Sequence, residues 1–185
     1  MRSFSTVMIL VITFCAFTAT PGLTQKLSYG LNGGISIPQG DGSDYWKLGY
    51  SINGGASYRI TPYFSLNMRA AYNRWKQDEG GFGNFTILEF IPAIQIYPLR
   101  NDNQTLRPFI HGGLGVYYLD FKLKTSGYWI YEESDNDTRP GTSMGIGTQY
   151  SLSNSISLEF LSLYHIIFTK DDTTQYFSLS AGLWF

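Results

Sequence analysis

Apolar residues recur at every second position in eight segments of the chain, and this period restricts the fold more than any other sequence feature. Because successive side chains of a β-strand point to opposite faces, the pattern predicts strands with one apolar and one polar face. The last segment is the clearest, with an apolar face made of Phe177, Leu179, Ala181, Leu183 and Phe185. No helical period is found after residue 24, so we expect an all-β fold.

The connections between these segments alternate in length. Short, turn-like connections lie at Thr61-Pro62, at Asn101–Thr105 and at Ser153-Asn154. The other connections are mostly longer and polar: Gln39–Tyr45, Lys76–Asn84, Thr125–Arg139 and Thr169–Thr174. Eight strands of about ten residues each, joined in this way, predict an eight-stranded antiparallel up-and-down transmembrane β-barrel.

Proline placement supports these strand boundaries, with one exception. Prolines lack an amide donor and therefore sit at strand ends, as Pro38, Pro62, Pro98, Pro108 and Pro140 are expected to do. Pro92 instead falls in the middle of a predicted strand, where we expect a bulge or a misplaced boundary.

The polar faces decide between two kinds of barrel. A soluble lipid-carrier barrel turns its polar face to water and would carry many charges there. Here that face holds Gly, Ser, Asn, Ala and Gln, and only Arg69, Glu89 and Glu159 are charges well inside the strands. Small polar residues suit the narrow lumen of eight strands, and the apolar face then meets lipid. Aromatic residues at both ends of the segments are typical of membrane-interface girdles.

The N-terminus carries an export signal. Arg2 precedes a short apolar stretch, Val7–Phe17, and a segment of small residues follows it. This order is typical of a secretory signal peptide, so we expect residues 1–24 to be removed and residues 25–185 to form the barrel domain. The one cysteine, Cys15, lies in the signal, which leaves no disulfide for the barrel.

The C-terminal Ala181-Gly182-Leu183-Trp184-Phe185, with the export signal and the eight alternating strands, resembles small Gram-negative outer-membrane barrels of the OmpA/OmpX type. The resemblance implies location in the outer membrane, contact with its lipid and lipopolysaccharide, and Phe185 as a signal read by the barrel assembly machinery. The candidate mature start at Gln25 also looks like that of Bacteroidetes secreted proteins.

Catalytic and metal-binding patterns are weak in this sequence. Its two histidines, His111 and His165, are not close in sequence to a serine and an acid in a known motif, so we expect no enzyme and no catalytic residue. Asp135-Asn136-Asp137 lacks the glycine and glutamate of a calcium loop, so neither metal nor cofactor is expected. A net charge of −1 without a basic stripe argues against nucleic acid as a partner.

Two further groups of residues are candidates for a role. Tyr128, Trp129 and Tyr131 in the longest connection form a possible surface contact, or equally a strand extension above the membrane. Antiparallel pairing about residue 79 or 80 places Arg69 opposite residues 89 to 91, so we predict that Arg69 meets Glu89, with Glu159 sharing Arg69 across the lumen. Such an ionic plug would close the barrel, whereas separately hydrated charges would indicate a wet lumen.

The function we expect is therefore a structural or surface-interaction role for a barrel with a side-chain-filled lumen. Two alternatives stay open: an outer-membrane lipid-modifying enzyme, and a small pore or channel for apolar solutes.

Overall fold

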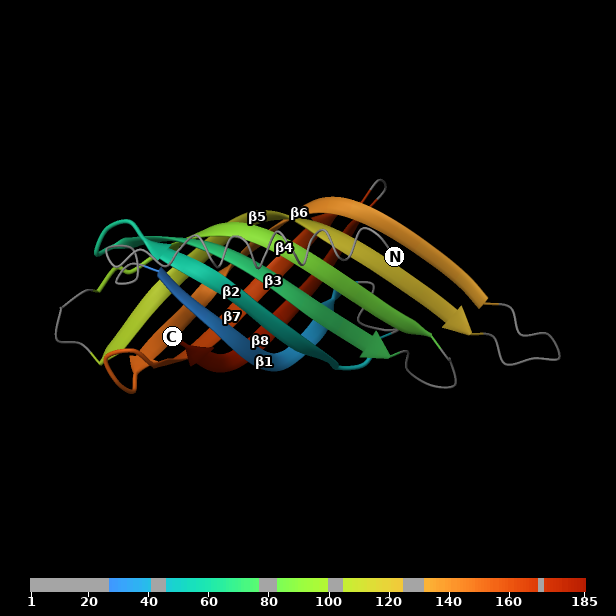
Figure 1. Ribbon diagram of the computed structural model, residues 1–185. Helices are drawn as coiled ribbons and strands as arrows, with labels where there is room; N and C mark the ends of the chain where they lie inside the picture. The colour runs from blue at the N-terminus through green and yellow to red at the C-terminus, as the bar shows by residue number, and fades with distance from the viewer. Residues whose placement is uncertain (1–26, 41–45, 77–82, 100–104, 125–131, 170–171) are drawn as a thin grey trace, which may run out of the picture.

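The computed structural model describes residues 27–40, 46–76, 83–99, 105–124, 132–169 and 172–185, and the predicted signal peptide lies outside this part of the chain. Eight strands follow one another: β1 (Leu27–Gln39), β2 (Gly49–Arg59), β3 (Phe64–Lys76), β4 (Asn84–Ile96), β5 (Leu106–Lys124), β6 (Glu132–Ser151), β7 (Ser157–Phe168) and β8 (Thr173–Trp184). Each strand pairs with the next, and the order closes into a barrel (Figure 1). The predicted eight-stranded antiparallel barrel is confirmed. Among the described residues, no helix has the length and hydropathy needed to cross a membrane.

Pairing of the first and last strands closes the barrel. β1 and β8 run antiparallel, with Leu31 opposite Leu183 and Ile37 opposite Phe177. Beyond the end of β8, the amide of Phe185 donates to the carbonyl of Tyr29 at 2.8 Å, and the amide of Tyr29 donates back at 3.1 Å. Since every strand then has two neighbours over most of its length, hydrocarbon meets few unpaired backbone groups.

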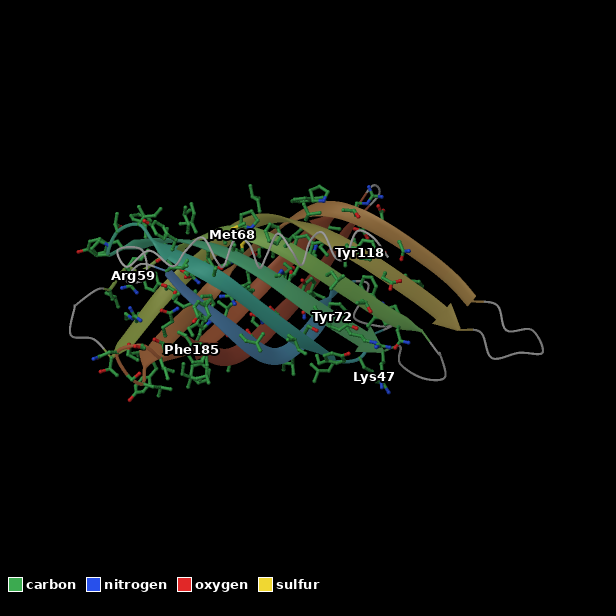
Figure 2. All side chains as sticks on the ribbon, viewed as in Figure 1. Lys47, Arg59, Met68, Tyr72, Tyr118 and Phe185 are labelled. Carbon is green, nitrogen blue, oxygen red and sulfur yellow. The ribbon has the colours of Figure 1, made fainter. Side chains whose placement is uncertain are left out.

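The alternation of faces is as the sequence predicts. Polar side chains of the inward face, such as Asn67, Gln95 and Ser143, are buried, whereas the outward Leu31, Leu114 and Ile146 are among the most exposed apolar residues. Figure 2 shows Met68 of β3 on the outer surface and places Lys47 and Arg59 at opposite ends of the barrel. We call these the loop end, near Lys47, and the turn end, near Arg59.

The predicted polar connection Thr125–Arg139 is wrong in part, because β6 already begins at Glu132 and its residues Glu132–Pro140 pair with β5. Pro140 therefore lies inside a strand and not at its end. β6 pairs with β7 only from Gly141 onward, so the missing amide of Pro140 lies where β6 has no second neighbour.

Pro92 needs no bulge and no new boundary. β4 continues through it, with Pro92 opposite Met68 of β3. On the β5 side, pairing stops after Phe90 and resumes at Ala93 in the same register. The missing amide thus interrupts the β4–β5 ladder locally without shifting it.

Candidate functional site

The inward side chains meet in the lumen, where an ion pair forms the first of two polar clusters. The Nη2 atom of Arg69 (β3) lies 2.9 Å from Oε1 of Glu159 (β7), and both side chains are almost completely buried. Arg69 Nη1 donates to Asn53 Oδ1 at 2.8 Å. Glu159 also accepts from Asn32 Nδ2 at 2.8 Å and from Gln149 Nε2 at 3.2 Å. A buried ion pair is tolerated when further hydrogen bonds of this kind accompany it. The Nε atom of the Arg69 guanidinium finds no such partner among the described residues.

Trp184 links this cluster to the closing strand. Its ring centroid lies 5.4 Å from the guanidinium carbon of Arg69, within the range of a cation–π contact. Its indole Nε1 donates to Asn32 Oδ1 at 3.2 Å. Residues of six strands, β1, β2, β3, β6, β7 and β8, therefore meet around one charge pair, which ties opposite walls of the barrel together.

Glu89 belongs to a second cluster, and the predicted cross-strand contact with Arg69 is wrong. The β3–β4 register sets Arg69 opposite Ile91 and Glu89 opposite Ala71. Glu89 therefore lies nearer the loop end, where it accepts from Tyr176 Oη at 2.7 Å and from Asn73 Nδ2 at 3.3 Å. Arg69 pairs instead with Glu159, the third member of the predicted network.

His165 joins Glu89 to a serine. Its Nδ1 lies 3.1 Å from Glu89 Oε2, and its Nε2 lies 3.1 Å from Ser178 Oγ. The order serine, imidazole, carboxylate is that of nucleophilic sites. Here, however, the ring of Tyr176 stacks on the imidazole at 4.3 Å between centroids, and Ser178 is buried. The three side chains thus form a hydrogen-bonded chain inside the barrel, and its serine is buried.

Sequence reasoning missed this serine–histidine–glutamate cluster. One usable signal was present, since Glu89, His165 and Ser178 all lie on inward faces of their strands. The alternation does not predict how far along the barrel axis each of these residues lies. His111, the other histidine, is likewise buried in the lumen, 3.3 Å from Ser143 Oγ through its Nε2.

Apolar side chains occupy the lumen toward both ends. Nearer the loop end is a buried cluster of Trp75, Ile87, Ile91, Ala93, Tyr117, Ile167 and Tyr176. Tyr97, Phe109, Leu161 and Leu163 form a second cluster nearer the turn end. The described lumen thus holds these two buried apolar clusters together with the two polar clusters.

The remaining predicted site residues are only partly placed. Tyr128, Trp129 and Tyr131 lie outside the described residues, in the stretch of sequence between β5 and β6. Phe185 follows β8, and its ring stacks on Tyr29 at 6.2 Å between centroids on the outer face. Within the part of the chain that the structure describes, no group of three potential metal ligands comes together.

A family model described as the outer membrane protein beta-barrel domain matches residues 7–185. The chain belongs to this family. The predicted resemblance to small Gram-negative outer-membrane barrels is thereby confirmed, and so is the location of the protein in the outer membrane. A comparison with curated proteins finds no match.

Several solved structures share the fold. Neisserial surface protein A has a TM-score of 0.64 and 16% identity, over 85% of this chain and 95% of that one. Ail, the attachment invasion locus protein of Yersinia pestis, has a TM-score of 0.56 and 17% identity, over 86% of this chain and 98% of that one. A major outer membrane protein of Thermus thermophilus has a TM-score of 0.56 and 12% identity, over 86% of this chain and 98% of that one. At these identities the likeness shows the fold alone.

Proposed function

We propose that the protein is a non-conducting barrel that anchors a surface hairpin, made of β5 and β6, for contact with molecules outside the cell. Two features support this role: a lumen filled by side chains, and the length of the hairpin. The length of the hairpin carries the proposal, because a filled lumen alone would suit a purely structural protein equally well.

The hairpin is longer than a membrane crossing requires. β5 has 19 residues and β6 has 20, whereas a tilted membrane strand needs about 9–11. Residues Glu132–Pro140 of β6 extend past the end of β7 and pair with β5 alone. This part amounts to roughly 30 Å of strand, and Figure 1 shows the hairpin projecting beyond the other strands at the loop end.

The projecting part of β6 forms an edge of the sheet, because no described strand pairs with it on the β7 side. Such an edge invites strand pairing, and natural proteins protect it with charge or proline. Glu132, Glu133, Asp135 and Asp137, followed by Pro140, are of this kind. Arg139 forms an ion pair with Asp137. The sequence along this edge of β6 therefore suits a strand edge that is exposed to water without aggregating.

Contact with a partner is assigned to the aromatic residues that connect the two strands. Tyr128, Trp129 and Tyr131 supply large contact areas of the type that dominates interfaces. Ail is named an attachment protein, and it offers a precedent of function on a similar fold, not evidence for this chain.

Chymotrypsin added to intact cells tests the display of the hairpin, because it cleaves after tyrosine and tryptophan. We expect fragments that end at Tyr128, Trp129 or Tyr131 before the cells are lysed. Tyr63, in the turn between β2 and β3, and Phe64, the first residue of β3, serve as the internal control and should be cut only after the outer membrane is opened. Cleavage of the control sites first would reverse the orientation and contradict the proposal.

A lipid-modifying enzyme is the second candidate, and the cluster of Ser178, His165 and Glu89 is the observation in its favour. We assign the cluster a structural role, because a nucleophile must reach its substrate and Ser178 is buried. A fluorophosphonate probe tests this assignment in the folded protein. We expect no labelling of Ser178, together with an unchanged lipid A mass spectrum in cells that lack the protein. Labelling that is lost in Ser178→Ala would favour the enzyme.

A further inference from the structure

A small aromatic pocket opens at the loop end of the barrel, above the buried apolar cluster. It has a volume of about 130 Å³. Trp75 and Tyr176, both almost fully buried, form its floor, while the half-buried Trp46 and Phe85 contribute walls. Asp172 lies on its rim, directly before β8. The pocket belongs neither to the ion pair of Arg69 nor to the projecting hairpin.

Packing and hydrogen bonds hold the rings in place. Trp75 packs against Phe85 and Tyr176 with centroid distances of 5.6 and 5.2 Å, and Trp46 packs against Phe85 at 5.6 Å. The indole of Trp75 donates to the carbonyl of Ser36 at 3.1 Å. A ligand would therefore meet rings that are already ordered, which lowers the entropic cost of binding.

The pocket has an acidic side chain at its opening. Among the described residues that line it, Asp172 is the charged one. One carboxylate oxygen of Asp172 accepts from the amide of Thr173 at 2.7 Å, so its other oxygen can face a ligand. Behind the floor, the hydroxyl of Tyr176 donates to Glu89 at 2.7 Å, which adds electron density to that ring.

We propose that this pocket binds a small organic cation of the quaternary ammonium class. The negative faces of aromatic rings attract cations, and groups of several rings are the known means of recognising quaternary ammonium groups. A primary ammonium carries three donors that must be satisfied on burial. The buried part of this pocket presents the rings of Trp75 and Tyr176, while the polar Gln39, Thr173, Thr174 and Gln175 also line it. A quaternary group has no such donors, so its burial leaves no unsatisfied hydrogen bond, and the ring faces offset part of its desolvation.

NMR titration of the folded protein in a polyoxyethylene detergent tests the proposal, since this detergent has neither a choline nor a sugar headgroup. The probe is choline chloride, at an ionic strength held constant with sodium chloride. The indole signals of Trp46 and Trp75 should shift and saturate, while that of Trp184 stays in place. The neutral carbon isostere 3,3-dimethylbutan-1-ol should bind about tenfold more weakly, as expected for a desolvated cation–π contact.

Two variants separate the contribution of charge from that of shape. Asp172→Asn should weaken choline binding by about twofold to fivefold, the range of an exposed ion pair. Asp137→Asn, an exposed acid of β6 that does not line the pocket, should leave it unchanged. Equal affinities for choline and its neutral isostere, or no shift of Trp46 and Trp75 in the wild type, would overturn the proposal. Shifts with glucose but not with choline would assign the pocket to a sugar instead and overturn it as well.

Discussion

Arg69 of β3 and Glu159 of β7 meet inside the barrel, with Nη2 and Oε1 2.9 Å apart, although 90 residues separate them in the chain. Both side chains are almost completely withdrawn from solvent, with exposed fractions of 3% and 0%. Each is therefore stabilised by the other and by its hydrogen bonds to the surrounding amides.

Replacing Arg69 by alanine should lower the free energy of unfolding by about 3 kcal/mol, because it leaves Glu159 buried without its counter-charge. Equilibrium unfolding in urea, followed by tryptophan fluorescence in detergent, measures this loss. Lys76→Ala, an exposed position on the same strand, is the matched control and should change stability by less than about 0.5 kcal/mol. A loss below about 1 kcal/mol for Arg69→Ala would mean that the pair is hydrated.

The double variant Arg69→Met, Glu159→Leu should recover much of that loss. Removal of both charges leaves neither one unpaired, and apolar replacements of a buried ion pair are often neutral. The same urea titration, arranged as a double-mutant cycle, gives the coupling energy. Additive losses for the two single substitutions would show that the side chains do not depend on each other.

Tyr176→Phe should destabilise the barrel by about 1 to 2 kcal/mol, because Glu89 loses its shortest hydrogen bond while the apolar packing of the ring is kept. Thermal unfolding in detergent measures the change. Tyr63→Phe, at an exposed turn position, supplies the control and should be neutral. Equal effects of the two substitutions would remove the structural role assigned to the Glu89 cluster.

Adjacent glycines of β1 provide a matched pair for testing how closely the strands approach. A Cβ on the inward Gly34 would collide with the backbone carbonyl of Leu179 on β8, whereas one on the outward Gly33 meets nothing within 4 Å. Gly34→Ala should therefore cost about 1–3 kcal/mol, and Gly33→Ala should be tolerated. The fraction of folded barrel, seen as the heat-modifiable band in unboiled gels, measures both. Tolerance of both substitutions would contradict the register of β1 and β8.

Deletion of Phe185 should reduce the amount of barrel in the outer membrane. The residue contributes two backbone hydrogen bonds to the closing strand pair, and we propose that its aromatic ring is read during assembly. Phe185→Leu keeps the backbone bonds and removes only the ring, so the two variants separate closure from recognition. Membrane fractionation with an immunoblot measures both. Normal amounts of the deletion variant would refute the assembly role.

Local patterns predicted most of the fold. Alternation over Tyr176–Phe185 identified the inward and outward faces of β8, because a strand has the same period wherever it lies. The polar composition of Glu132–Arg139, which is typical of a loop, led to the wrong prediction of a connection there. That segment forms a strand because β5 pairs with it beyond the end of β7.

The contacts across the lumen could not be predicted in the same way. Alternation shows that Arg69, Glu89 and Glu159 point inward, but the tilt and stagger of the strands decide which of them lie at the same height. Ile91, and not Glu89, is the residue of β4 that lies opposite Arg69. The grouping of Glu89 with His165 and Ser178, from β4, β7 and β8, likewise depends on closure of the whole barrel.

Closure of the lumen by side chains is tested most directly by single-channel recording in a planar bilayer. Purified, folded protein should insert without producing unitary current steps in potassium chloride. We expect this because the Arg69–Glu159 pair and the two buried apolar clusters leave no continuous path for ions. Parallel insertions of a known porin show that the bilayer reports conductance. Reproducible unitary steps from the wild-type protein would contradict the account.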